Sequence, residues 1–287
     1  MSDDNNNRGS GNPLGKNVDY ETNYQPSLLF PIARQDKRNE LGFSTDLSES
    51  LPFDGADIWN AYELSWLNSK GLPQVAIAEF IVPANSPNII ESKSFKLYLN
   101  SLNQSQFESQ QALQETMQND LSQVVGENVS VTVTALDSNI ANNIGSFEAD
   151  CIDHQEISIK QYDYDPSLLK LDKNESISSQ TISESLCSHL LKSNCLITNQ
   201  PDWASVLIQY KGAKICHASL LQYLVSFRTH NEFHEQCVER IFCDILNYCQ
   251  PHKLTVYARY TRRGGLDINP WRSNCVASMD NIRLVRQ

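Results

Sequence analysis

The chain has 287 residues, of which 40% are hydrophobic and 20% charged, and its formal net charge is −11. It is long enough to bury a sizeable core, and no apolar stretch approaches the run of about 18 residues that a spanning helix needs. Its acidic balance argues against broad contact with nucleic acid, which relies on clustered Lys and Arg. We therefore expect a cytoplasmic protein that acts on a small molecule, with neither a nucleic acid nor a membrane as direct partner.

The eight cysteines are interpreted as free thiols. A disulfide framework is typical of small exported proteins, whereas the segment Met1–Asn12 is polar and has no apolar signal core. The sequence contains no C-x-x-C pair. It therefore predicts no metal site.

Residues 1–18 are rich in Asn, Asp, Gly and Ser and are predicted to form a disordered tail. The stretch Gly9–Lys16 comes near two phosphate-binding motifs and completes neither. A dinucleotide fingerprint needs glycine where Leu14 stands, and a P-loop needs glycine where Ser10 stands.

Hydrophobic periodicity next predicts a first module over residues 19–136. Its expected elements, in chain order, are strands at about 57–67 and 74–82, helices at about 93–102 and 106–124, and a strand at 129–133. Residues 137–180 are predicted to be a linker, and the short alternation at 157–162 indicates an edge strand within it.

An internal repeat then predicts a second module over residues 181–287. Glu91–Leu102 aligns with Cys216–Phe227, and Ser, Tyr, Leu and Ser recur in register. The expected elements of this copy are strands at about 183–192 and 204–210, helices at about 217–228 and 232–249, and a strand at 254–258.

Both copies thus follow the order β-β-α-α-β, with room for a fourth strand. Strands separated by paired helices favour an α+β fold, in which an antiparallel sheet carries its helices on one face. The repeat alone names no chemistry.

Cys195 and Asp202 are candidates for catalysis. Cys195 lies in a polar loop that leads into a strand, where a thiol can act as a nucleophile if its surroundings lower its pKa. Asp202 follows Pro201, whose fixed φ can hold the carboxylate toward the thiol as a proton donor or acceptor. Alternatively, Cys195 is a small buried apolar residue and Asp202 a turn or cap residue.

A second candidate group lies between the two helices of the second copy. Phe233, His234 and Glu235 there offer an aromatic wall, an acid and a carboxylate able to accept two N–H groups of a guanine-like edge. Asn231 is predicted to cap the second helix. Glu235 alternatively only complements the helix N-terminus.

Two further segments suit phosphate binding. Glu91, Ser92 and Lys93 open a predicted helix, whose free N–H groups attract anions. The run Arg262–Gly265 places two arginines beside two glycines, so that the backbone can approach a ligand closely. A plain surface helix and a basic hairpin turn are the alternatives.

Five stretches together resemble the long, two-module form of the 7-cyano-7-deazaguanine reductases, a nitrile reductase family of queuosine biosynthesis. The stretches are Glu63–Asn68, Glu91–Tyr98, Asn194–Thr198, Phe233–Arg240 and Arg262–Trp271. The resemblance implies tandem tunnelling-fold modules. The signature Glu91–Tyr98 stands in the first copy and the nucleophile context of Cys195 in the second, so one complete site would need both.

The resemblance also implies an activity and roles for individual residues. NADPH would reduce the nitrile to an amine through a thioimide on the cysteine. The catalytic residues would be Cys195, Asp202 and His234; the substrate-binding residues Ile90, Glu91, Ser92, Phe233, His234 and Glu235; and the NADPH-binding residues Ser92, Lys93, Arg263 and Gly264. The Arg262–Arg263 pair would, with Lys93, favour NADPH over NADH.

Two other functions stay open from the residues alone. One is a cyclohydrolase-like enzyme of pterin or purine metabolism, which would recruit zinc. The other is a non-catalytic purine-binding or tRNA-associated protein. Because tunnelling folds close barrels by association, we expect a homodimer.

Overall fold

The computed structural model describes residues 21–43, 50–138, 144–172 and 181–287. The predicted tail, residues 1–18, lies outside these ranges. No helix in the described ranges is both long and apolar enough to cross a membrane.

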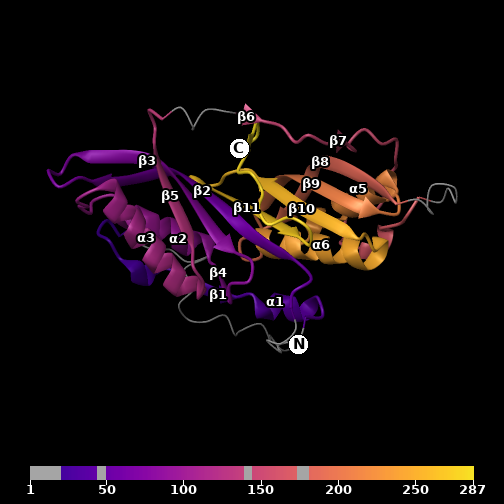
Figure 1. The fold of residues 1–287 in the computed structure, drawn as a ribbon, viewed down its shortest axis with the longest axis horizontal. Helices are drawn as coiled ribbons and strands as arrows, with labels where there is room; N and C mark the ends of the chain where they lie inside the picture. Colours follow the sequence, from indigo (N-terminus) through magenta and orange to yellow (C-terminus); the bar gives the residue numbers. More distant parts are fainter. Residues whose placement is uncertain (1–20, 44–49, 139–143, 173–180) are drawn as a thin grey trace.

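The described chain is built on one large twisted sheet (Figure 1). Eight strands follow one another in the order β5-β3-β2-β11-β10-β9-β8-β7, and all neighbours are antiparallel except β7 and β8. The strands of the sheet are β2 (Asp54–Leu67), β3 (Pro73–Pro83), β5 (Ser130–Ala135), β7 (Asp150–Cys151), β8 (Ile182–Asn194), β9 (Pro201–Gly212), β10 (Lys253–Tyr260) and β11 (Leu266–Ser273). Two small two-stranded pairs flank it, β1 (Pro31–Ala33) with β4 (Asn88–Ile90) and β6 (Ile144–Gly145) with β12 (Arg283–Leu284).

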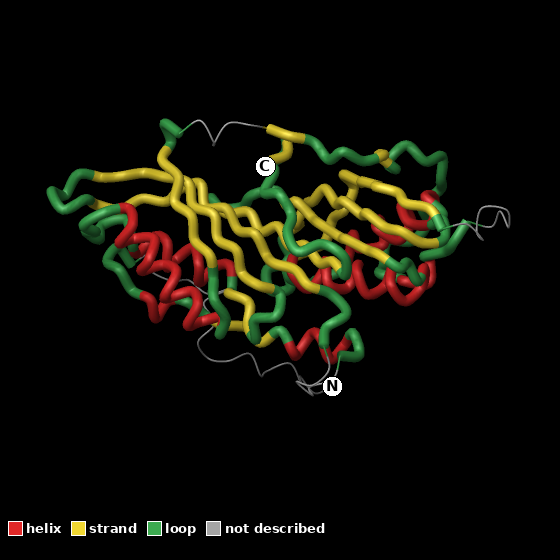
Figure 2. The backbone as a smooth tube through the Cα atoms, viewed as in Figure 1, coloured by secondary structure: helices red, strands yellow, loops and turns green. Residues whose placement is uncertain are grey.

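The long helices cover one face of this sheet (Figure 2). They are α2 (Ser92–Ser101), α3 (Gln110–Val125), α5 (His217–Ser226) and α6 (His234–Cys249), and a short helix α1 (Gln35–Glu40) precedes β2. The α+β class with an antiparallel sheet and paired helices, predicted from the sequence, is confirmed.

The two halves of the chain meet where β2 pairs with β11. The ladder runs from Leu266 opposite Ala61 to Ser273 opposite Asp54. The halves therefore share one continuous sheet. β11, which joins them, is the fourth strand of the second copy, and the predicted order β-β-α-α-β allowed for such a strand.

Each half has its own core beneath the sheet. In the first half, Trp59 and Phe80 of the strands pack edge-on against Phe95 of α2, with ring centroids 5.3 and 5.0 Å apart. In the second half, Val206 and Phe242 belong to a separate buried cluster. The inward residues alternate along the strands, which is why the pattern could be recognised in the sequence.

Two predicted helix starts are corrected by the capping interactions. The helix expected from about 106 begins at Gln110, because the Ser109 hydroxyl accepts the Ala112 N–H at 3.1 Å. The helix expected from about 232 begins at His234. Its N-cap is Phe233 rather than Asn231, and the side chain of Gln236 accepts the Phe233 N–H.

The edge strand predicted at 157–162 is wrong. In the described part of the linker, the strand that pairs with the sheet is β7, in parallel register with β8. Ile157 and Ile159 do pack against the core of the second half, but without a backbone ladder. Apolar alternation indicates that one side of a segment is buried and says nothing of its hydrogen bonds. It therefore could not distinguish a paired edge strand from an extended segment that only packs against the core.

A buried cluster of charges crosses the junction of the halves. Arg272 of β11 contacts Asp57 of β2 and Glu239 of α6, each at 2.8 Å. Glu239 also accepts from Arg38 of α1 at 2.8 Å, and Arg34 pairs with Asp57 at 2.5 Å. All five side chains are almost fully buried. The cluster ties α1, β2, β11 and α6 together.

Glu239 tests the importance of this cluster. Burial alone would raise the pKa of its carboxyl, but Arg272 and Arg38 lower it to about 2. Glu239→Ala removes a carboxylate that neutralises the buried Arg38 and Arg272, so we expect it to cost about 3–5 kcal/mol in the free energy of urea unfolding. Because the pKa is depressed, the contribution of this group is present above pH 4.5 and is lost as the pH falls toward 2.

The control is Lys37→Ala, which breaks the surface pair with Glu40 and should cost less than about 1 kcal/mol. An equally small loss in Glu239→Ala would contradict the assigned role.

Candidate active site

A pocket lies at the junction of the two halves, and both halves supply its walls. The residues from the first half are Trp59, Ile90, Ser92 and Lys96; those from the second are Cys195, Asp202, Phe233, His234, Glu235, Thr261, Arg263, Leu266 and Ile268. Cys195, Asp202, His234, Phe233 and Glu235 are thus brought together, as the sequence predicted.

Cys195 sits at the first position of the tight loop between β8 and β9. Its N–H donates to the Gln200 carbonyl at 2.8 Å, and its carbonyl accepts from the Asn199 N–H at 3.0 Å. Asn199 adopts the left-handed conformation, with φ 56°, and its side-chain oxygen accepts from the Asn231 amide at 3.0 Å. Asn231, predicted to be a helix cap, therefore braces the loop of Cys195 instead.

Asp202 is held between two basic side chains on the pocket wall. His234 Nε2 lies 3.4 Å and Arg263 Nη1 3.2 Å from its carboxylate. The aspartate is nearly buried, whereas Arg263 is 36% exposed. The Asp202 carboxylate can therefore exchange a proton with the neighbouring imidazole, and its contact with Arg263 restricts its movement.

His234 is oriented by an aromatic stack. Its ring lies on Tyr260 of β10 with centroids 3.8 Å apart and an interplanar angle of 5°. Its Nδ1 finds no hydrogen-bond partner within the described ranges. The stack and the contact with Asp202 fix the ring plane and direct Nε2 at the carboxylate.

Glu235 is buried at the start of α6, one residue after His234. Burial and the negative charge of Asp57 together raise the pKa of its carboxyl to about 7, against the lowering effect of His234. Phe233, the residue before His234, contributes an aromatic surface to the same wall. The Glu235 side chain can accept hydrogen bonds as a carboxylate only when it is deprotonated.

In the first half, Ile90 and Ser92 reach the pocket, but Glu91 is not part of its wall. The Glu91 carboxylate caps its own helix and accepts the N–H groups of Lys93 and Ser94 at 2.8 and 2.7 Å. Burial raises the pKa of this carboxyl, while those two hydrogen bonds lower it. The structure thus places Glu91 beside the pocket with its carboxylate turned toward α2.

A second hollow of about 220 Å³ adjoins the pocket, and Lys96 and Leu266 line both. Lys93 and Gly264, predicted to bind a cofactor, lie on its wall. Burial lowers the pKa of Lys96, and the positive charges of Arg263 and Lys93 lower it further. Three cations at this boundary favour an anionic ligand such as a phosphate.

The glycine pair after Arg263 makes this hollow possible. Gly264 and Gly265 have φ values of 60° and 74°, and the Arg263 N–H donates to the Leu266 carbonyl at 2.8 Å to close the turn. The predicted arginine pair does not act together. Arg262 turns away and stacks over Tyr62, 4.3 Å from the ring centroid.

Several wall residues were not predicted to belong to the site. Trp59, Leu266 and Ile268 appear in the sequence as ordinary strand residues, and Tyr260 behind His234 does as well. Lys96 stands in the signature stretch and lies one helical turn after Ser92, which puts both on one face of α2. That spacing was the available signal.

Comparison with known proteins extends over both halves. Residues 20–133 match the family described as nitrile reductase, 7-cyano-7-deazaguanine-reductase N-term, and residues 201–278 match QueF-like protein. The chain is 57% identical over 274 residues to a protein of Hydrogenovibrio crunogenus, with 96% of each chain covered. It is 55% identical over 276 residues to proteins of Chromobacterium violaceum and Cupriavidus pinatubonensis, with 96% of this chain and 96% and 98% of theirs covered.

All three relatives are named NADPH-dependent 7-cyano-7-deazaguanine reductase. The chain belongs to the 7-cyano-7-deazaguanine reductase family. The resemblance found in five stretches of sequence is therefore confirmed. In this member of the reductase family, the two regions that match family models include every wall residue of the pocket except Cys195.

The turn that carries Arg263 gives a test of the site's architecture in this reductase. A Cβ on Gly265 would lie 2.6 Å from the carboxyl carbon of Glu63, an exposed side chain that can rotate away, so the cost of the substitution is the strain of a positive φ. We expect Gly265→Ala to destabilise the protein by about 1–3 kcal/mol in urea unfolding.

Gly42 is the matched control, since it has φ +84° and no atom within 4 Å of a Cβ. Gly42→Ala should cost about the same, because it introduces the same kind of strain. A loss in Gly265→Ala close to zero would contradict the positive φ that the turn requires.

Proposed function

We propose that the protein reduces the nitrile of 7-cyano-7-deazaguanine to the aminomethyl group with NADPH, a step in queuosine biosynthesis. The observation that carries the proposal is the single pocket in which Cys195, Asp202 and His234 meet beside a cationic hollow. The names of relatives at 55–57% identity agree with this activity.

The residues around the hollow fit a cofactor that bears phosphates. Lys93 and Lys96 supply positive charge on its wall, and Arg263 does so from the adjoining pocket. Gly264 has no side chain to block close approach of a ligand to the backbone. We assign NADPH binding to Ser92, Lys93, Arg263 and Gly264, with Lys96 at the boundary to the substrate pocket. Reduced nicotinamide supplies hydride to a carbon acceptor.

Cys195 begins the reaction by adding its sulfur to the nitrile carbon. The C–S bond forms as one π bond of the nitrile breaks, and the nitrogen takes a proton, which gives a thioimide. This adduct is a better hydride acceptor than the nitrile, so covalent capture divides one difficult step into easier ones. Asp202 and His234 are placed to take up the proton of the thiol and to deliver it to the nitrogen, since both line the pocket with Nε2 of His234 3.4 Å from the carboxylate.

The same pair acts again after reduction begins. Once the carbon carries one added hydrogen, the C–S bond breaks, the thiolate of Cys195 leaves and an imine remains. The second reduction gives the amine, and each reduction takes up one proton at nitrogen. The whole reaction consumes two NADPH and two protons, and Asp202 with His234 relays the protons.

The substrate is held by the pocket's acidic and apolar walls. The Glu235 carboxylate accepts N–H groups of the deazaguanine edge, and Phe233 and Ile90 cover the ring, with Ser92 at the rim. Glu91 joins them if its carboxylate exchanges the N–H groups of α2 for those of the substrate. Each exchange of this kind replaces one charge-assisted hydrogen bond by another.

In this proposal residues 19–136 and 181–287 are two tunnelling-fold modules joined by the linker 137–180. The sheet they form is open, and β5 ends it with an unpaired edge in the described chain. We propose that the protein associates as a homodimer, which would bring open sheets together, and that it works in the cytoplasm.

Turnover provides the direct test of the activity. Protein mixed with the nitrile and NADPH should lose the absorbance of reduced nicotinamide in a ratio of two NADPH to one amine. NADH should be a much poorer donor, because Lys93 and Arg263 favour the additional phosphate. A protein that only binds the base would consume no NADPH.

Covalent capture is tested by denaturing mass spectrometry. Protein and nitrile without NADPH should give a species heavier by one intact substrate, because addition expels no leaving group. Cys195→Ala should abolish the adduct and turnover, whereas Cys275→Ala, at an exposed cysteine, should retain both. Reduction by Cys195→Ala would refute the mechanism.

Substrate binding should depend on pH through Glu235. Because the pKa of its carboxyl is about 7, the accepting form is depleted as the pH falls below that value, and KM for the nitrile should rise. In Glu235→Gln the KM should be high and almost independent of pH over the same interval. If KM in Glu235→Gln still rose with falling pH as it does in the parent protein, the titrating group would be a different residue.

A further inference from the structure

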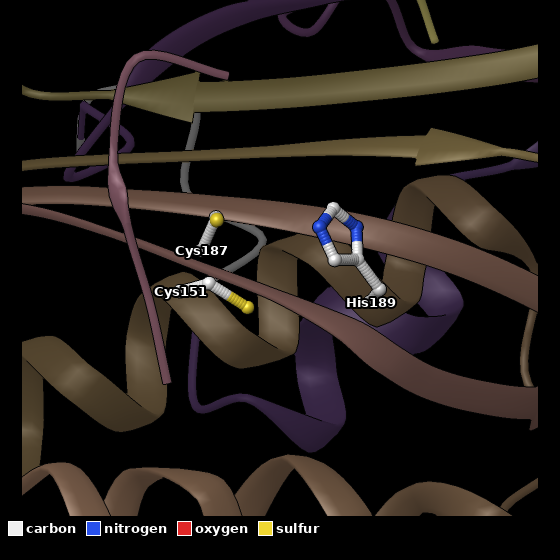
Figure 3. A group of neighbouring side chains, drawn as sticks. All are labelled: Cys151, Cys187 and His189. Carbon is white, nitrogen blue, oxygen red and sulfur yellow. The ribbon is translucent and has the colours of Figure 1, made fainter. Parts of the chain in front are cut away.

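Two cysteines and a histidine gather away from the active site. One ligand atom each of Cys151, Cys187 and His189 lies within 4.8 Å of the others, and Figure 3 shows the three side chains grouped together. None of them lines the pocket of Cys195. The proposed nitrile reduction has no use for them.

The backbone explains why these residues meet. β7 pairs in parallel with β8, and Cys151 stands directly opposite Cys187 in the register. Successive residues of a strand point to opposite faces. Leu186 belongs to the core beneath the helices, so Cys187 and His189 lie on the other face of the sheet.

The imidazole of His189 is oriented as a metal ligand requires. Its Nδ1 contacts the Ser205 hydroxyl at 2.8 Å, which leaves Nε2 for another partner. A second hydrogen bond of this kind fixes the tautomer of metal-binding histidines. The backbone of His189 is held as well, since its N–H donates to Asp153 at 2.8 Å and its carbonyl accepts from Arg286 at 2.9 Å.

The cluster opens onto a hollow of about 510 Å³, and all three side chains are on its wall. The other walls come from the segment around Phe147 and from the residues Leu284–Arg286. A metal held by three protein ligands would therefore have room for a fourth ligand on the open side. Zinc is bound by three protein ligands and one exchangeable ligand in catalytic sites, so this coordination is one that the ion adopts in proteins.

We propose that Cys151, Cys187 and His189 form a zinc site that is distinct from the catalytic pocket. Two thiolates and one imidazole are soft donors, which select zinc over magnesium or calcium. The distance along β8 from Cys187 to Cys195 is about 25 Å at strand spacing. The site is thus too far from the nucleophile to share a ligand with it.

Binding requires the two thiols to lose their protons, so each zinc ion taken up releases two protons and forms two Zn–S bonds. Burial raises the pKa of the Cys187 thiol to about 11, and Cys151 and Asp153 contribute to the rise. A cation bound between the two sulfurs would favour their thiolate forms.

The site would hold the linker to the sheet. β7 is only Asp150–Cys151, and its pairing with β8 covers two residue pairs. Metal bonds from Cys151 to Cys187 and His189 would fix this short strand in register. A zinc ion that binds only the folded state would raise the free energy of unfolding by mass action.

The test is a titration of the reduced, metal-free full chain with Co²⁺, followed by Zn²⁺. One equivalent of cobalt should give thiolate-to-metal charge-transfer bands and the visible bands of tetrahedral cobalt, and zinc should displace it. Cys151→Ser and His189→Ala, both at exposed positions, should lose the bands and keep turnover.

The matched controls are Cys275→Ser, another exposed cysteine, and Cys195→Ala; both should retain the bands. The proposal is overturned if the reduced chain gives no bands, or if the bands survive in Cys151→Ser and vanish in Cys195→Ala. It is also overturned if Cys151 and Cys187 are isolated as a disulfide and the reduced form binds no cobalt.

Discussion

The ion pairs of Arg272 are the interaction on which the architecture depends. The guanidinium is completely buried between Asp57 and Glu239, at the seam where β11 of one half pairs with β2 of the other. A buried charge without its partners costs several kcal/mol, so the halves are stable only in the arrangement that pairs these groups. The pocket lies at this seam and takes its walls from both halves.

The same seam sets the electrostatics of the site. The negative charge of Asp57 helps to raise the pKa of Glu235 to about 7, while Arg34 acts in the opposite direction. On the other side of the pocket, Arg263 and Lys96 provide positive charge near Asp202. In the proposed reaction, one pocket thus combines a carboxylate for the base edge with cations for the phosphates.

The sequence predicted the repeat and the α+β class, because strand and helix periods are local properties. The residues that meet in the pocket were predicted from five short stretches that resemble a known family. It could not predict the partners of Glu91, whose carboxylate caps its own helix. Nor could it place Arg262, which stacks on Tyr62. The approach of Cys151 to Cys187 could not be predicted either, because it follows from strand register, which single-sequence patterns do not specify.

We infer that each chain builds a complete site from its own two halves. Lys96→Ala removes a cation from the pocket wall of the first half, and Cys195→Ala removes the proposed nucleophile of the second half. When the two variants are co-expressed and purified together, nitrile-dependent NADPH oxidation should not exceed the activity of the separate variants, because Lys96 and Cys195 line the same pocket within one chain. Substantial recovery of turnover in the mixture would instead show that the halves of a site come from different chains.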